Sequence, residues 1–219
     1  MTQSKKAILF DIDGTLVDST YHHALAWQRA FDSRGVTLPM WRIHRTVGMG
    51  GDKLVAEVAG EEVEERLGDE LRALWREEYV AVKSEVLPLP GASELVRTLA
   101  DSGFLVALAT SGDPEFAGEA LDDVDIRDAV RVLRTSADVD GSKPEPDLIE
   151  VTLEALGTRR GALVVDTPYD VQAAERAGLK CIGLRSGGYS EAELTEAGAA
   201  LVVDSPADLQ GLDWEQYLP

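Results

Sequence analysis

The sequence predicts an α/β fold: a Rossmann-like parallel sheet core with an inserted α-helical cap domain. Two observations predict the sheet. Short apolar runs recur along the chain, and the later runs alternate with segments of helical periodicity. A third observation predicts the insertion, because residues 18–87 carry helical patterns and no convincing strand.

The predicted strands are apolar runs that are too short to form helices. They are AILF (7–10), FLVALA (104–109), ALVV (162–165), LKCIGL (179–184) and ALVV (200–203). The segments ASELVRTLADSG and PDLIEVTLEALG have helical periodicity, and each ends in a glycine that favours helix termination. Alternating strands and helices predict parallel pairing with both faces covered, and ligands of such sheets bind at the carboxyl ends of the strands.

The predicted cap contains two long amphipathic patterns. YHHALAWQRAFDSRG places Ala24, Trp27 and Phe31 on one helical face, and EEVEERLGDELRALWREEYVAV places Leu67 and Leu71 on another. The proline-rich stretch LPLPG then returns the chain to the alternating pattern. The predicted core domain comprises residues 1–17 and 88–219, and the predicted cap comprises residues 18–87.

Composition limits the classes of partner. The chain has 219 residues, and its 44% hydrophobic and 28% charged residues are typical of a folded globular protein. Its 40 acidic and 21 basic residues give a formal charge of −19, so neither nucleic acid nor a membrane is an expected partner. A small phosphorylated metabolite would need local positive charge from a metal and a few basic side chains.

Cysteine content and hydropathy predict the compartment. The single cysteine, Cys181, lies in an apolar run, so we expect a buried thiol and no intramolecular disulfide or cysteine-based zinc site. No signal peptide or membrane-spanning stretch is predicted, so a cytoplasmic location is expected. The sequence carries no signal for oligomeric state, and a monomer is the default expectation.

Two acids follow the first predicted strand. Residues i and i+2 of an extended strand point the same way, so Asp11 and Asp13 share a face. Two crowded carboxylates cost free energy unless a cation joins them or one is protonated. A hard divalent ion, with Mg²⁺ the usual choice beside phosphate, would resolve the conflict. The alternative is a pair of surface acids at a strand end.

The stretch DIDGTLVDS resembles the first motif of the haloacid dehalogenase-like (HAD) hydrolase superfamily. The other three motifs of that family follow in order and extend the resemblance over nearly the whole chain. They are carried by Thr110 in FLVALATSG, Lys143 in DGSKPEPDL, and Asp166 and Asp170 in ALVVDTPYD. Taken singly, each has an ordinary alternative: a turn hydroxyl, a loop lysine, or a helix cap begun by Thr167 and Pro168. Their joint order favours the family.

The resemblance implies a phosphoric monoester hydrolase in which Asp11 is the nucleophile and forms an aspartyl-phosphate. It also implies Mg²⁺ held by Asp11, the backbone carbonyl of Asp13 and Asp166, with Asp170 supporting the metal or the lysine. Asp13 would act as general acid and then as general base, and a pKa raised by neighbouring carboxylates would suit that role. The remaining implied contacts to the phosphoryl group come from Thr110, Ser111, Gly112 and Lys143.

The cap is expected to carry substrate specificity, with His23, Arg45 and Lys53 as the candidate contacts. The closest pattern is the phosphoglycolate phosphatase-like branch, from which Val165 departs because that branch usually has glycine there. A beta-phosphoglucomutase-like sugar phosphomutase is the alternative: His23 and Trp27 resemble its cap residues, but Gly48 lacks the Ser-Arg pair that follows it in those mutases. A non-catalytic binding or regulatory module on the same fold is a second alternative.

Overall fold

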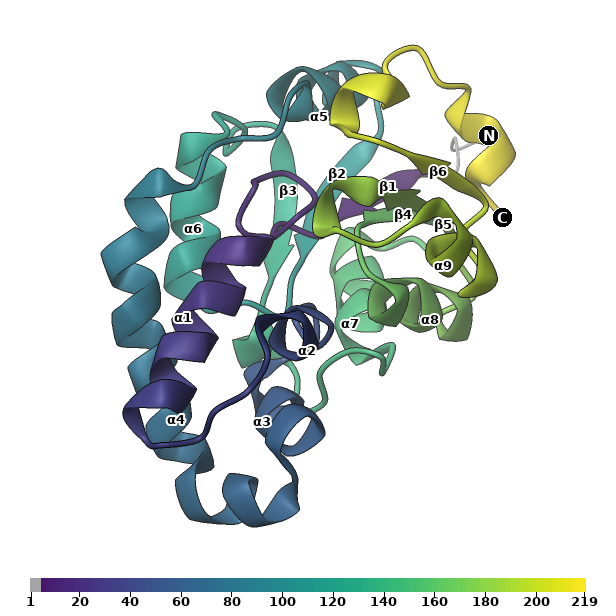
Figure 1. Cartoon of the computed structure of the whole chain (residues 1–219). Helices are drawn as coiled ribbons and strands as arrows, with labels where there is room; N and C mark the ends of the chain where they lie inside the picture. Colours follow the sequence, from purple (N-terminus) through teal and green to yellow (C-terminus); the bar gives the residue numbers. More distant parts are fainter. Residues whose placement is uncertain (1–4) are drawn as a thin grey trace. The chain divides into compact units, whose positions relative to one another are not determined.

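The structure is a computed structural model that describes residues 5–219, and these form two compact units (Figure 1). The first unit joins the segment ending at Asp18 to Pro88–Pro219, and the second comprises Ser19–Leu87. Among residues 5–219, none of the helices is both long enough and apolar enough to cross a membrane.

The first unit is built on a six-stranded parallel sheet with the order β3-β2-β1-β4-β5-β6. Its strands are β1 (Ala7–Phe10), β2 (Leu105–Ala109), β3 (Val130–Arg134), β4 (Gly161–Val165), β5 (Lys180–Leu184) and β6 (Leu201–Val203). The predicted α/β class is therefore confirmed. Five of these strands coincide with the predicted apolar runs to within a residue at each end.

The strand β3 is missing from the sequence prediction. Its residues VRVLR include Arg131 and Arg134, and none of its side chains is fully buried. As the edge strand beside β2, it needs no continuous apolar run, because one of its edges and part of its faces meet solvent. The pattern that identifies buried parallel strands therefore does not apply to it.

Helices cover both faces of the sheet. They are α5 (Ala92–Asp101), α6 (Pro114–Asp123), α7 (Asp147–Leu156), α8 (Pro168–Arg176) and α9 (Glu191–Glu196). On one face, Ala7 and Leu9 of β1 pack with apolar residues of α7, α8 and α9, whereas α5 lies on the opposite side of the sheet (Figure 1). Successive residues of β1 alternate between these two layers, and all four are fully buried.

The register of the central strands positions the site. Phe10 of β1 lies opposite Leu108 of β2 and Val164 of β4, and the Asp11 N–H donates to the Val164 carbonyl at 3.0 Å. The residues that follow β1, β2 and β4 therefore emerge side by side at one edge of the sheet. The strand order reverses at β1, and ligands of open α/β sheets bind at such a point.

The second unit is helical. Its elements are α1 (Thr20–Ser33), α2 (Met40–His44), α3 (Gly51–Ala59), α4 (Glu61–Val82) and the short 3₁₀ helix η1 (Lys83–Glu85). The apolar faces predicted for α1 and α4 form its core, in which Trp27, Phe31 and Leu71 are buried.

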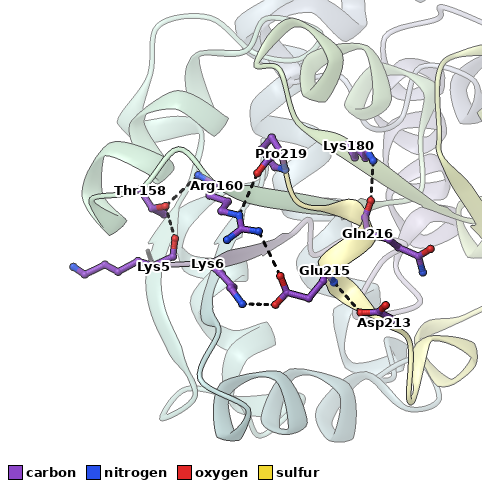
Figure 2. A network of polar contacts seen from close by, with 9 residues as sticks. All are labelled: Lys5, Lys6, Thr158, Arg160, Lys180, Asp213, Glu215, Gln216 and Pro219. Atoms are coloured by element: carbon purple, nitrogen blue, oxygen red, sulfur yellow. Dashed lines mark hydrogen bonds and ion pairs between the residues drawn. The ribbon is translucent and has the colours of Figure 1, made fainter. Parts of the chain in front are cut away.

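A C-terminal strap, residues 213–219, closes the amino edge of the sheet (Figure 2). Glu215 pairs with Lys6, which precedes β1, and with Arg160, which precedes β4. Lys180 Nζ donates to the Gln216 carbonyl at 2.7 Å, while Trp214 is only 6% exposed. The strap therefore combines exposed ion pairs with a buried aromatic ring.

Burial of Trp214, more than the ion pairs, should hold the strap. We expect Trp214→Ala to lower the free energy of unfolding by about 3 kcal/mol, since a buried tryptophan is replaced by a cavity. Glu215→Gln should cost less, because solvent screens exposed ion pairs. Urea denaturation at pH 7 measures both, and a larger loss for Glu215→Gln than for Trp214→Ala would contradict this view.

Candidate active site

A buried ion-pair cluster lies where β1 ends. Asp11 follows β1 directly and is 3% exposed. Its Oδ2 lies 3.0 Å from Nζ of Lys143, and the same ammonium group pairs with Oδ1 of Asp170. One buried cation thus faces two buried carboxylates.

A third acid joins the cluster from the end of β4. Asp166 is 1% exposed, and its Oδ1 accepts a hydrogen bond of 3.1 Å from the Thr15 hydroxyl. Asp11, Asp166 and Asp170 each present one carboxylate oxygen within 4.8 Å of the others. The cluster therefore contains three acids and one lysine, which pairs with two of them, so it carries an excess of negative charge when all of its groups are ionised.

Burial and the neighbouring charges shift the pKa values of this cluster. Burial raises the pKa of Asp11 to about 7, and the carboxylates of Asp170 and Asp13 add to the rise while Lys143 opposes it. Burial likewise holds the pKa of Asp166 well above its ordinary value, helped by Asp170 and Asp11. Burial by itself would lower the pKa of Lys143, but Asp11 and Asp170 outweigh it and hold that pKa above the ordinary value.

These groups fit a hard divalent cation. Carboxylate oxygens are the ligands that Mg²⁺ prefers, and added positive charge would let the acids ionise together. Asp11 Oδ1 is also buried and accepts no hydrogen bond from any of residues 5–219. Buried carboxylate oxygens are normally satisfied, so this oxygen is a suitable metal ligand.

Asp170 is held by the start of α8. Thr167 is the N-cap, and its hydroxyl accepts the Asp170 N–H at 3.3 Å and donates to Asp170 Oδ2. Pro168 takes the first helical position, where no backbone donor is needed. The helix N-cap predicted at TPYD is therefore present. Asp170, which belongs to it, also pairs with Lys143.

The second strand supplies a neighbouring group of polar side chains. Thr110 follows β2, is 2% exposed, and accepts the Gly112 N–H through its hydroxyl at 3.0 Å. A Cβ placed on Gly112 would lie 3.3 Å from Asp13 Oδ2, so the Asp13 carboxylate lies beside this turn. Ser111 Oγ is buried and has no hydrogen-bond partner within residues 5–219. The side chain of Asp13 is thus outside the group formed by Asp11, Asp166 and Asp170.

The cap candidates belong to the second unit. His23 on α1 stacks on Tyr79 of α4 with ring centroids 4.1 Å apart, and also on Trp75. Arg45 directly follows α2, and Lys53 lies on α3. Within this unit His23 has a packing role, and a substrate-binding role for these three residues stays a prediction.

Val165 fits the core without disturbing the acids. It is the last residue of β4, is fully buried, and lies opposite Gly183 of β5 in the register. It packs in the same apolar cluster as Val171 and Leu194, and Asp166 still joins the acid group. The space of the missing side chain at Gly183 is taken by Leu194, whose Cδ1 lies 3.1 Å from a Cβ placed there.

Comparison with known proteins identifies the family. The model of the haloacid dehalogenase-like hydrolases matches residues 8–184, which include Asp11, Thr110, Lys143 and Asp166. The chain belongs to this family. The predicted membership is confirmed.

Relatives extend the match over most of the chain. A validoxylamine A 7'-phosphate phosphatase from Streptomyces hygroscopicus subsp. limoneus is 31% identical over 222 residues, covering 98% of this chain and 99% of the relative. A phosphoglycolate phosphatase from Pseudomonas putida is 28% identical over 94% of this chain and 78% of its own length. The crystal structure of a hydrolase from Pseudomonas syringae is 33% identical with a TM-score of 0.88, covering 94% of this chain and 96% of that one. These relatives confirm the predicted enzyme class, a phosphoric monoester hydrolase of this family.

Thr15 is a site residue that the sequence did not predict. Its hydroxyl reaches a carboxylate 151 positions further along the chain, and nothing local to DIDGT indicates that contact. The only available signal was a hydroxyl two residues after Asp13.

The raised pKa of Asp11 predicts a pH-dependent stability of the metal-free protein. Between pH 4 and 7 the unfolded chain has lost the Asp11 proton and the folded chain keeps it, so this group destabilises the fold as pH rises. Asp11→Asn cannot ionise, and its stability relative to wild type should be higher at pH 8 than at pH 5 by a few kcal/mol, at roughly 1.4 kcal/mol per pKa unit. Urea denaturation with chelator measures the free energy of unfolding of both proteins. The prediction is refuted if the difference between variant and wild type is the same at pH 5 and at pH 8.

Proposed function

We propose that this chain is a Mg²⁺-dependent phosphatase that hydrolyses a small phosphorylated metabolite through an aspartyl-phosphate on Asp11. The observation that carries the proposal is the buried Asp11, which has one oxygen on Lys143 and the other without a protein donor among residues 5–219. A purely structural salt bridge would use only Oδ2, the oxygen that pairs with Lys143. A residue that is both nucleophile and metal ligand also needs an oxygen such as Oδ1, which accepts no hydrogen bond from residues 5–219.

In the proposed reaction, an Asp11 carboxylate oxygen attacks phosphorus, and the bond from phosphorus to the ester oxygen breaks. Lys143 holds Asp11 in place and supplies positive charge beside the transferring group. Bound Mg²⁺, held by Asp11 and Asp166 with Asp170 nearby, would offset the repulsion between the carboxylate and the phosphate dianion. Thr110 and Ser111, at the end of β2, would donate to phosphoryl oxygens.

Asp13 would move the protons. Its carboxylate lies beside Gly112 and is not one of the three clustered acids, and we assign the proton transfers to it. It would protonate the departing alkoxide and then take a proton from the water that hydrolyses the aspartyl-phosphate. In this proposal Asp11 of the cluster makes the nucleophilic attack, and Asp13 provides the acid–base catalysis.

The names of the relatives support the class of substrate. The two curated relatives described above are named as phosphatases of phosphoglycolate and of a 7'-phosphate. We therefore propose a phosphate monoester of a small metabolite, with the helical unit Ser19–Leu87 as the source of specificity.

Asp11→Asn should abolish phosphate release. We expect a loss of roughly 10³-fold or more, since an amide is a poor nucleophile and a poor metal ligand. The assay is phosphate release from a panel that contains phosphoglycolate and hexose phosphates, with Mg²⁺ and with chelator. Chelator-resistant release by wild type would contradict the proposed metal, and interconversion of hexose phosphates without phosphate release would indicate the mutase instead.

Asp13→Asn should separate catalysis from metal binding. The rate should fall by roughly 10²–10⁴-fold, as expected for loss of a general acid. Mg²⁺ affinity, measured by calorimetric titration, should stay near the wild-type value, because the Asp13 side chain is outside the acid group. Loss of Mg²⁺ binding in this variant would mean that the Asp13 carboxylate is itself a ligand.

A further inference from the structure

The loop after β5 also reaches the acid cluster, although it belongs to none of the four family motifs. This β5 loop, residues 185–189 (RSGGY), begins with the 3₁₀ helix η3 (Arg185–Gly187) and continues through Gly188 to Tyr189. Because β5 pairs with β4 in parallel, its carboxyl end emerges at the same edge of the sheet as Asp166.

Gly187 lies in direct contact with Asp166. A Cβ placed on Gly187 would be 2.1 Å from Asp166 Oδ2 and 2.8 Å from the Cβ and Cγ of Asp166. The backbone of Gly187 is outside the left-handed region, so its conformation alone would accept an L side chain. Glycine is therefore required here by the space that the Asp166 side chain occupies.

The opposite oxygen of Asp166 is held by the first motif. Thr15 donates its hydroxyl hydrogen to Oδ1 at 3.1 Å, while Gly187 lies against Oδ2. The Asp166 carboxylate is thus enclosed between two segments that are far apart in the sequence.

The β5 loop is itself anchored at two points. Ser186 donates its hydroxyl hydrogen to the Gly14 carbonyl at 2.5 Å, which ties the loop to the segment that carries Thr15. Tyr189 is 4% exposed and packs in the apolar cluster that contains Val165. These anchors join the loop both to the segment after β1 and to the core beneath β4.

We infer that Gly187 is a positioning residue for the metal ligand Asp166, and that Ser186 holds the β5 loop in the position this requires. The inference rests on the proposed function, since it assigns a task to the cation site proposed there. A side chain at residue 187 would displace the Asp166 carboxylate and weaken cation binding, because metal ligands must be held within a fraction of an ångström.

Gly187→Ala tests the inference, with Gly118→Ala as the matched control. Gly118 lies in α6, and the nearest atom to a Cβ placed there is Arg127 Nη2 at 4.0 Å, so the same substitution meets open space. Calorimetric titration with Mg²⁺ should give a dissociation constant at least tenfold higher for Gly187→Ala and unchanged for Gly118→Ala. Circular dichroism and metal-free urea denaturation establish that each variant is folded.

Ser186 provides a second, milder pair of variants. Ser186→Ala removes the hydrogen bond to Gly14 and should raise the Mg²⁺ concentration needed for half-maximal activity severalfold, with kcat at saturating Mg²⁺ within about threefold of wild type. Ser186→Thr keeps the hydroxyl and should restore the lower requirement. A general loss of structure would not be rescued in this way.

The outcomes separate the inference from the proposed function. If wild type binds Mg²⁺ and releases phosphate while Gly187→Ala and Ser186→Ala bind Mg²⁺ equally well, the inference is wrong and the phosphatase proposal stands. If wild type neither binds Mg²⁺ nor shows chelator-sensitive phosphate release, both are wrong.

Discussion

The contact of Lys143 with Asp11 and Asp170 is the interaction on which the site depends. Buried carboxylates are costly unless they are paired, and here one ammonium group serves two of them, with Asp166 close by. The surrounding structure supplies further partners: Thr15 for Asp166 and Thr167 for Asp170. Burial is the main cause of the raised pKa of Asp11, and the neighbouring carboxylates of Asp170 and Asp13 add to it. The excess of negative charge that remains explains the fit of the cluster to a divalent cation.

The candidate active site and the contacts that hold the C-terminal strap lie at opposite edges of the parallel sheet. At its carboxyl edge, the residues after β1, β2 and β4 form the candidate active site. At its amino edge, Lys6, Arg160 and Lys180 contact the C-terminal strap (Figure 2). The strap also carries the buried Trp214. In a chain of charge −19, basic residues are scarce. Lys143 is buried among acids, where its charge acts on the proposed nucleophile, whereas the strap cations are partly or fully exposed and therefore screened.

The family motifs and the β5 loop contribute differently to the site. The motif residues supply charged and hydroxyl groups that can be recognised by type and order. Gly187 and Ser186 act through the space and backbone contacts they provide. Such contributions have no distinctive residue pattern, since glycine and serine are common in loops for other reasons.

The sequence by itself predicted the parallel sheet, five of its six strands and the identity of the clustered acids. Buried parallel strands are nearly continuous apolar runs, so β1, β2, β4, β5 and β6 were predicted from composition, whereas the edge strand β3, with Arg131 and Arg134, was not. Only the tertiary structure decided which groups meet. The contacts from Thr15 to Asp166, from Ser186 to Gly14 and from Gly187 to Asp166 depend on strand order and register, because parallel pairing brings together residues that local sequence patterns cannot relate.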